Sequence, residues 1–413
     1  MKKVSVIAAA VAASLAAGSA FAVDFNGYMR AGTAISNHGT GDQAFEKKGV
    51  GRLGNENDNY YEFGFAKELK TGEQTWKVES MIASSDDGKS GWENKEINVA
   101  QFNVQAKGLF ASDPDAVLWA GKRYYQRKDI HITDFYYLDT SGTGGGIENV
   151  SVGNQKLSVA LIQDGAHENS TGYIFDARLA NIGVWDNASL ELAVAYNFAT
   201  DKDNVSEQAD DGVLLSAILH QGLSNGFNQT ILQYGTNGYG KQVANFGSGT
   251  WYDRGKSDNN DASAFRLINW GVVSLGERWE VGHQLAYMNG SDIPGYKKEK
   301  DKDDKVHDVY TGKNLDINQY SAVVRPMYKW NDTMRTVFEA GYHGGKKTAG
   351  TETEDFGHAK LTVAQAWAMG DSFWSRPELR VYGSYLHDTK NDDRFGTGND
   401  SEFVVGVQVE AWW

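Results

Sequence analysis

The 413-residue sequence contains no cysteine and only four prolines. Without cysteine the chain cannot form disulfides, thiolate metal sites or a cysteine nucleophile, so its stability must come from packing and backbone pairing. Scarce proline suits a fold rich in β-ladders, because proline has no N–H to donate. Acidic residues outnumber basic ones by 54 to 40, which argues against a nucleic-acid partner.

The first 22 residues have the pattern of a cleaved signal peptide. Met1-Lys2-Lys3 is a basic start, residues 4–17 are apolar and alanine-rich, and Ala20-Phe21-Ala22 supplies small residues for a signal peptidase. The apolar run is shorter than the roughly 20 residues that a membrane-spanning helix needs. We therefore expect residues 1–22 to be removed on export and residues 23–413 to form a single domain.

Beyond the signal, apolar and polar residues alternate with period two in several segments. In the last of them one face carries Phe403, Val405, Val407, Val409, Ala411 and Trp413, and the other carries Glu402, Gln408, Glu410 and Trp412. A water-soluble β-sandwich also alternates, since its strands have one buried and one solvated face. Aromatic residues near segment ends, such as Trp330 and Trp413, instead match the interfacial girdles of a membrane barrel.

The connections between these segments alternate between short and long. Tight turns are expected at 224–226, 330–332 and 370–371, and long polar loops at 35–51, 200–211, 236–262, 289–314, 344–357 and 387–401. The run 289–314 mixes charges so densely that we expect no strand there. Outer-membrane barrels have this asymmetry, and the chain length allows roughly 16 to 18 strands of about 10 residues. The sequence thus predicts an all-β transmembrane antiparallel barrel with an aqueous lumen.

The inward face of this barrel combines aromatic and charged residues. The combinations are Tyr28 with Arg30, Tyr60 with Glu62, Trp374 with Arg376, and Trp412 with Glu410. Aromatic rings stack on the apolar faces of pyranoses, while carboxylates and guanidiniums bond to sugar hydroxyls. A sugar chain is therefore the expected ligand, although any one of these rings could be a girdle or core residue instead.

Residues 119–139 (WAGKRYYQRKDIHITDFYYLD) are too irregular for a single membrane strand. We expect part of this segment to fold into the barrel and narrow the pore with opposed charges and a tyrosine. A competing hypothesis is a glycosidase in which Asp129 and Asp134 act as acid and base. We expect no cofactor and no metal, because His131 and His343 have no partners at metal-ligand spacing.

Several segments resemble one family along the whole of residues 23–413. They are VDFNGYMRAG from Val23, RLGNE from Arg52, WAGKRYYQR and DIHITDFYYLD within 119–139, RPMYKW from Arg325, GDSFWSRP from Gly370, and the closing VEAWW. In these segments the sequence resembles the maltoporins, sugar-specific porins of bacterial outer membranes. The resemblance implies an 18-stranded homotrimeric barrel with short periplasmic turns and long extracellular loops. It also implies passive facilitated diffusion of maltose and maltodextrins across a Gram-negative outer membrane, without catalysis.

The resemblance also implies roles for individual residues. The family's aromatic slide corresponds to Tyr28, Tyr60, Trp92, Phe227, Trp374 and Trp412, with Trp92 serving a neighbouring subunit. Tyr136 corresponds to the tyrosine that opposes the slide at the constriction. The polar tracks correspond to Arg30, Arg52, Glu62, Arg127, Asp129 and Asp134.

The sequence departs from the family at three places. Ala100 replaces an arginine of the tracks, Ala44 and Asn57 stand where some members have a cysteine pair, and the loop 387–401 is shorter. These departures leave open a general porin or one for another oligosaccharide such as sucrose. An exported glycan-binding protein or glycosidase is a more distant alternative. Outer-membrane lipid and a periplasmic maltose-binding protein are the remaining candidate partners.

Overall fold

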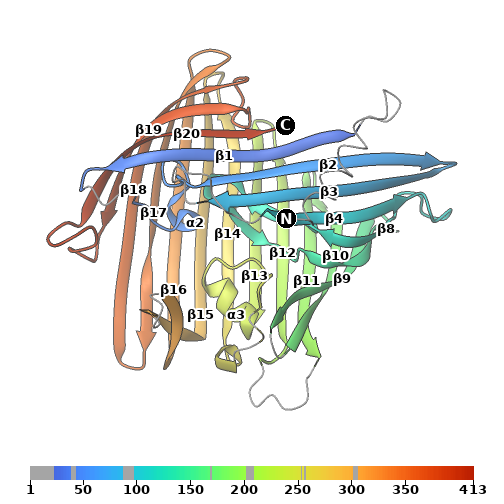
Figure 1. The fold of residues 1–413 in the computed structure, drawn as a ribbon, viewed down its shortest axis with the longest axis horizontal. Helices are drawn as coiled ribbons and strands as arrows, with labels where there is room; N and C mark the ends of the chain where they lie inside the picture. Colours follow the sequence, from blue (N-terminus) through green and yellow to red (C-terminus); the bar gives the residue numbers. More distant parts are fainter. Residues whose placement is uncertain are drawn as a thin grey trace, which may run out of the picture.

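The structure, a computed structural model, describes residues 23–38, 43–86, 97–167, 170–200, 209–252, 254, 257–300 and 306–413. The expected signal peptide and Trp92 lie outside these residues. Among the residues described, no helix has the length and apolarity to cross a membrane. Eighteen antiparallel strands form one sheet, which closes because β1 pairs with both β2 and β20 (Figure 1). The predicted barrel is confirmed, with 18 strands.

The strands of the wall follow one another in chain order. They are β1 (Asp24–Ser36), β2 (Asn59–Thr71), β3 (Gln74–Asp86), β4 (Asn98–Lys107), β5 (Val117–Arg123), β8 (Gly142–Val152), β9 (Gln155–His167), β10 (Ser170–Trp185), β11 (Ala188–Thr200), β12 (Gly212–Leu223), β13 (Gly226–Thr236), β14 (Ser263–Leu275), β15 (Trp279–Lys300), β16 (Val306–Lys329), β17 (Met334–Ala349), β18 (Glu352–Ala368), β19 (Glu378–Asp388) and β20 (Ser401–Trp412). Each strand pairs with its sequence neighbour, except that β5 pairs with β8. The helical segments are α2 (Lys47–Val50), α3 (Gly238–Ala244), η1 (His131–Thr133) and η2 (Ser257–Asn259).

The alternation seen in the sequence separates an apolar outer face from a polar inner face. On β20, Phe403 and Val405 are 50% and 48% exposed, whereas Glu402 and Glu410 are 1% exposed. This contrast arises because successive side chains of a strand point to opposite faces of the sheet. Apolar groups that would be costly in water are stable against lipid, so the outer face fits a membrane.

The expected division into short turns and long loops agrees with the structure at some positions and is wrong at others. Turns fall at 224–225 and 330–333, close to the predicted 224–226 and 330–332, but the connection at 369–377 is longer than the turn predicted at 370–371. The loop predicted at 200–211 lies mostly outside the described residues. However, β15 and β16 continue through most of 289–314 and pair as far as Lys300 and Val306. The region 344–357 is likewise a strand hairpin, in which Ala349 pairs with Glu352. Beyond the bilayer both faces of a hairpin meet water, so charged side chains do not prevent the ladder from continuing.

Several connections fold into the barrel and form the core there, among them the two that follow β1 and β5 and the one that carries α3. The loop between β1 and β2 carries α2, which lies against β16 and β17. Between β5 and β8, the hairpin of β6 (Lys128–Ile130) and β7 (Phe135–Leu138) forms a separate small sheet. Val50, Leu53, Ile130, Ile132 and Phe135 of these two connections are at most 1% exposed. The lumen is thus narrowed by packed loops, as expected for part of residues 119–139.

Candidate functional site

Three aromatic side chains from adjoining strands lie in sequence along the inner wall. Tyr60 of β2 and Tyr28 of β1 have ring centroids 6.0 Å apart. Tyr28 is in turn the register partner of Trp412 on β20. The barrel closure therefore brings residues from both ends of the chain into one row, and all three are partly exposed to the lumen.

The row continues toward the short-turn end of the barrel. Trp374 lies in the connection between β18 and β19. Its ring stacks on that of Phe227 of β13, with the ring centroids 6.4 Å apart and an angle of 29° between the ring planes. The His131 ring lies 5.5 Å from the rings of both Trp374 and Trp412. It therefore connects the Trp374–Phe227 pair to the first three rings of the row. Sequence reasoning did not place His131 in this row, because only the inward fold of its loop brings it there.

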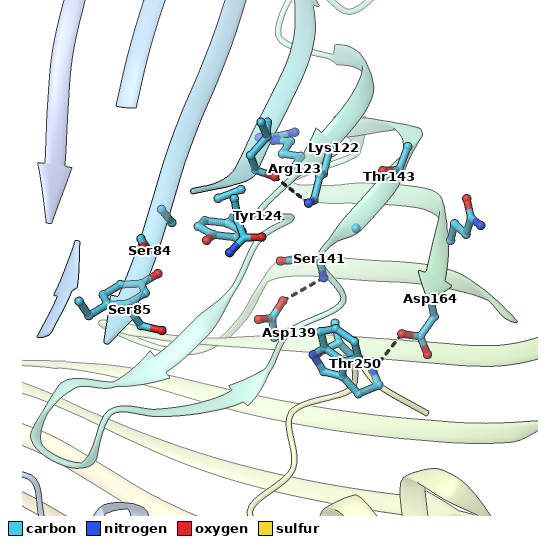
Figure 2. A pocket seen from close by; sticks show the side chains of 18 residues that line it. Ser84, Ser85, Lys122, Arg123, Tyr124, Asp139, Ser141, Thr143, Asp164 and Thr250 are labelled. Atoms are coloured by element: carbon cyan, nitrogen blue, oxygen red, sulfur yellow. Dashed lines mark hydrogen bonds between the residues drawn. The ribbon is translucent and has the colours of Figure 1, made fainter. Parts of the chain in front are cut away.

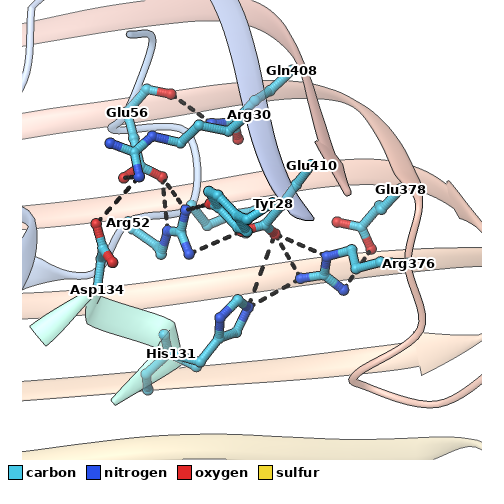
Figure 3. A network of polar contacts seen from close by, with 12 residues as sticks. Tyr28, Arg30, Arg52, Glu56, His131, Asp134, Arg376, Glu378, Gln408 and Glu410 are labelled. Atoms are coloured by element: carbon cyan, nitrogen blue, oxygen red, sulfur yellow. Dashed lines mark hydrogen bonds and ion pairs between the residues drawn. The ribbon is translucent and has the colours of Figure 1, made fainter. Parts of the chain in front are cut away.

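Beneath the row lies a buried network of ionic contacts around Glu410 (Figure 3). One carboxylate oxygen of Glu410 accepts from the Tyr28 hydroxyl at 2.9 Å and lies 2.9 Å from Arg52 Nη1. The other oxygen accepts from Arg376 Nε at 2.9 Å and Arg380 Nη2 at 2.7 Å. Arg52, predicted to line a polar track, is only 4% exposed. Its Nη2 donates to the Tyr28 hydroxyl at 2.8 Å, which fixes the orientation of that ring.

Arg30 forms a second cluster of charges above the row. It binds Asp58 with two hydrogen bonds, of 3.0 Å from Nε and 2.6 Å from Nη2, and its guanidinium lies 5.1 Å from the centre of the Tyr60 ring. Lys47 donates to Asp134 at 2.6 Å and to Glu56. Sequence reasoning missed Lys47, Glu56 and Asp58, because nothing in a polar loop indicates which of its charges turn inward.

The pKa values of the two carboxylates of the inward loop, Asp134 and Asp129, are shifted in opposite directions. Burial opposes ionisation of Asp134, but Arg52 and Lys47 outweigh it and lower its pKa to about 2. The pKa of Asp129 is raised, although this side chain reaches lumen water, because the surrounding wall and the charge of Asp134 disfavour its ionised form. Asp134 is therefore a fixed negative charge, whereas Asp129 is titratable.

The ion selectivity of the pore is expected to depend on Asp129 at acidic pH. Because the pKa of Asp129 is raised above its ordinary value of 3.8, this carboxylate becomes protonated at a higher pH than a free aspartate does. Protonation removes a negative charge from the lumen, so the preference of the pore for cations declines. Reversal potentials in a salt gradient, measured across this pH range, report the change. Asp129→Asn should abolish the step, and Asp134→Asn should move it to lower pH. A pH-independent reversal potential above pH 3.8 would contradict this assignment.

At the constriction the Arg127 guanidinium lies between two tyrosine rings. Its central carbon is 3.5 Å from the Tyr124 ring centre and 4.7 Å from that of Tyr136. Beside it, the Tyr60 hydroxyl donates to Glu62 at 2.5 Å. Burial raises the pKa of Tyr124 to about 12, so this hydroxyl remains a donor. The structure thus brings the predicted Arg127, Tyr136 and Glu62 together, and adds Tyr124, which sequence reasoning missed.

A cavity of about 490 Å³ adjoins Tyr60 and the constriction (Figure 2). Ala100, which replaces an arginine of the family pattern, lines this cavity and faces the lumen. At the other departure, Asn57 is buried and accepts a hydrogen bond from the Tyr382 hydroxyl. That contact attaches the first long loop to β19.

Comparisons with known proteins give a consistent result. The LamB porin family profile matches residues 23–413. A maltoporin of Vibrio cholerae is 75% identical over 416 residues and covers all of both chains. A maltoporin of Photobacterium profundum is 44% identical, covering 95% of this chain and 94% of that one. The crystal structure of Pseudomonas aeruginosa OpdK superposes with a TM-score of 0.51 at 10% identity, over 95% of this chain and 99% of that one, which supports the fold alone.

Proposed function

The chain belongs to the LamB porin family, and from this we propose that it is a sugar-specific channel through which maltose and maltodextrins diffuse. It is a β-barrel of the Gram-negative outer membrane and not an enzyme. The glycosidase hypothesis for Asp129 and Asp134 is therefore set aside. Asp134 is held in ion contacts with Lys47 and Arg30.

The observation that supports this function most directly is the continuous row of rings along the lumen. We propose that Tyr60, Tyr28, Trp412, Trp374 and Phe227 form a slide on which successive pyranose faces stack. Each ring offers a similar surface, so a glucosyl unit can move from one to the next without a deep minimum. Trp92 is proposed to extend the slide of a neighbouring subunit.

The polar groups beside the slide are proposed to exchange hydrogen bonds with sugar hydroxyls. Glu62, Arg127 and Asp129 reach the lumen, and Tyr136 is proposed to hold the sugar against the slide from the opposite side. Because each sugar–protein hydrogen bond replaces a bond to water, its net gain is only about 1 kcal/mol, which keeps residence short. We propose that Arg30 and Arg52, held in ion pairs, mainly position Tyr60 and Tyr28.

We further propose a homotrimer and, at the periplasmic turns, contact with a maltose-binding protein. Both proposals rest on the family resemblance. The trimer is also what the proposed role of Trp92 requires, because that residue would complete the slide of the adjacent subunit. Co-sedimentation with a periplasmic maltose-binding protein would test the second proposal.

Conductance in planar bilayers tests the function directly. Titration of the purified protein with maltohexaose should close the current in three equal steps, and maltose should block more weakly because it covers less of the slide. Sucrose serves as the comparison sugar, since a porin for other oligosaccharides would bind it at least as well. A stable conductance that none of the three sugars blocks would contradict the proposed sugar specificity, and closure in a single step would contradict the trimer.

A further inference from the structure

An exposed tryptophan lies inside the lumen, apart from the proposed slide. Trp251 belongs to the connection between β13 and β14, and its side chain is 83% exposed. It lines the 490 Å³ cavity together with Tyr60, the outermost described residue of the slide. Phe102, which is 68% exposed, lies on the outward face of the wall, where lipid covers it. The Trp251 indole instead borders the cavity, where its flat face can stack on a ligand.

The backbone of Trp251 is held in a strained conformation. Its φ is +64°, a left-handed value that bulky residues rarely adopt. Asp164 of β9 accepts from the backbone N–H of Trp251 at 2.9 Å and from that of Tyr252 at 3.1 Å. Gln242 of α3 donates to the Thr250 carbonyl at 2.9 Å. Such strain persists only where surrounding contacts enforce it, and it is frequent at ligand sites.

The residues next to Trp251 anchor the loop firmly. Tyr252 is 1% exposed, its hydroxyl donates to the Asp210 carbonyl at 2.8 Å, and the Arg254 guanidinium lies 4.6 Å from its ring centre. Asp164 itself is fixed by Asn197, whose amide donates to it at 2.7 Å. The backbone that carries the indole is therefore held at several points, and little loop entropy remains to be lost when a ligand binds.

The rest of the cavity carries donors and acceptors rather than one sign of charge. Figure 2 shows Arg123, Tyr124 and Asp139 on the walls around it, with Ser141 and Thr143 beside them. An exposed ring with hydroxyl, carboxylate and guanidinium groups around it matches a pyranose, which has apolar faces and a rim of hydroxyls. The mixture of opposite charges gives no preference for an anion or a cation.

We propose that Trp251 forms an outer subsite that stacks on a glucosyl ring of a long maltodextrin while the following rings enter the slide at Tyr60. This inference rests on the proposed maltodextrin permeation and adds a binding position away from the slide. Because Trp251 and Tyr60 border the same cavity, one chain can contact both. A disaccharide on the slide leaves the outer subsite empty, whereas a hexasaccharide can occupy the two together.

The test compares Trp251→Ala with wild type by current block in planar bilayers, using maltohexaose and maltose as probes. An aromatic contact contributes about 0.5–1.5 kcal/mol beyond its buried area, so the binding constant for maltohexaose should fall about three- to tenfold. The constant for maltose should change less than about twofold. Trp251→Phe keeps a stacking surface and should retain most of the maltohexaose affinity.

Trp367→Ala is the matched control, since it removes a tryptophan that is 44% exposed on β18 and away from the cavity; it should change neither constant. Unchanged maltohexaose block in Trp251→Ala, with normal block in wild type, would overturn the outer subsite and leave the channel function intact. An equal loss for maltose and maltohexaose would also overturn it, because that result indicates a disturbed slide. Absence of block in wild type would instead refute the proposed function.

Discussion

Replacing Glu410 with alanine is expected to lower the free energy of unfolding by about 3–5 kcal/mol, because it removes the counter-ion that three buried guanidiniums share. Glu410 is 1% exposed and contacts Arg52, Arg376 and Arg380. All three guanidiniums are themselves buried. Glu56 pairs with Arg52, and Glu378 pairs with Arg376 and Arg380, but Glu410 is the carboxylate that all three guanidiniums share. It also accepts from the Tyr28 hydroxyl.

Urea unfolding of the detergent-folded protein, followed by tryptophan fluorescence, measures this loss. Glu352→Ala is the control, because Glu352 forms an exposed ion pair with Lys313 and its removal should leave the midpoint unchanged. Glu410→Gln keeps the shape but not the charge and should also be destabilised. Unfolding of Glu410→Ala at the wild-type urea concentration would show that the three guanidiniums find other partners.

The second large effect concerns the slide. Trp374→Ala and Trp412→Ala should each weaken maltohexaose binding about tenfold, since each ring contributes about 1.4 kcal/mol of stacking. Both rings lie 5.5 Å from the His131 ring and share it as a neighbour, so the loss in the double variant should differ from the roughly 100-fold product of the two single losses. Current block and the uptake of radiolabelled maltohexaose into liposomes provide two independent readings.

A tryptophan on the outer wall provides the comparison for these variants. Trp279 of β15 is 39% exposed and packs against Tyr328, away from the lumen. Trp279→Ala should therefore leave maltohexaose binding unchanged. If Trp374→Ala and Trp412→Ala both bound maltohexaose like wild type, the assignment of the slide would be wrong, whatever the fold.

Local patterns in the sequence predicted the wall well, and the reason is that strand alternation is itself local. Phe403 and Glu402 differ in their surroundings because they are adjacent on one strand, and period two alone predicts this. The same reasoning failed for 289–314, where charge density suggested a loop. Charge opposes a strand only where one face must be buried, and above the bilayer neither face is.

Contacts made by inward-folding loops could not be predicted in the same way. Arg52 looked like a lumen residue, yet it is buried against Glu410, a residue more than 350 positions away in the chain. Lys47 and Asp58 lie in a polar loop whose sequence does not indicate which side chains enter the barrel. Trp251 lacks strand periodicity, so only the folded structure shows that it borders the same cavity as Tyr60.

The pairing of β1 with β20 sets a constraint on how the molecule is assembled. The hydrogen bond between Tyr28 and Glu410 joins residues 382 positions apart. The wall therefore cannot close until residues 401–412 have been synthesised, and until then β1 and β19 each present an unpaired edge. Such edges are templates for aggregation. An incomplete barrel would also expose its polar lumen to lipid, so loss of this one strand should prevent assembly rather than weaken it in proportion to its length.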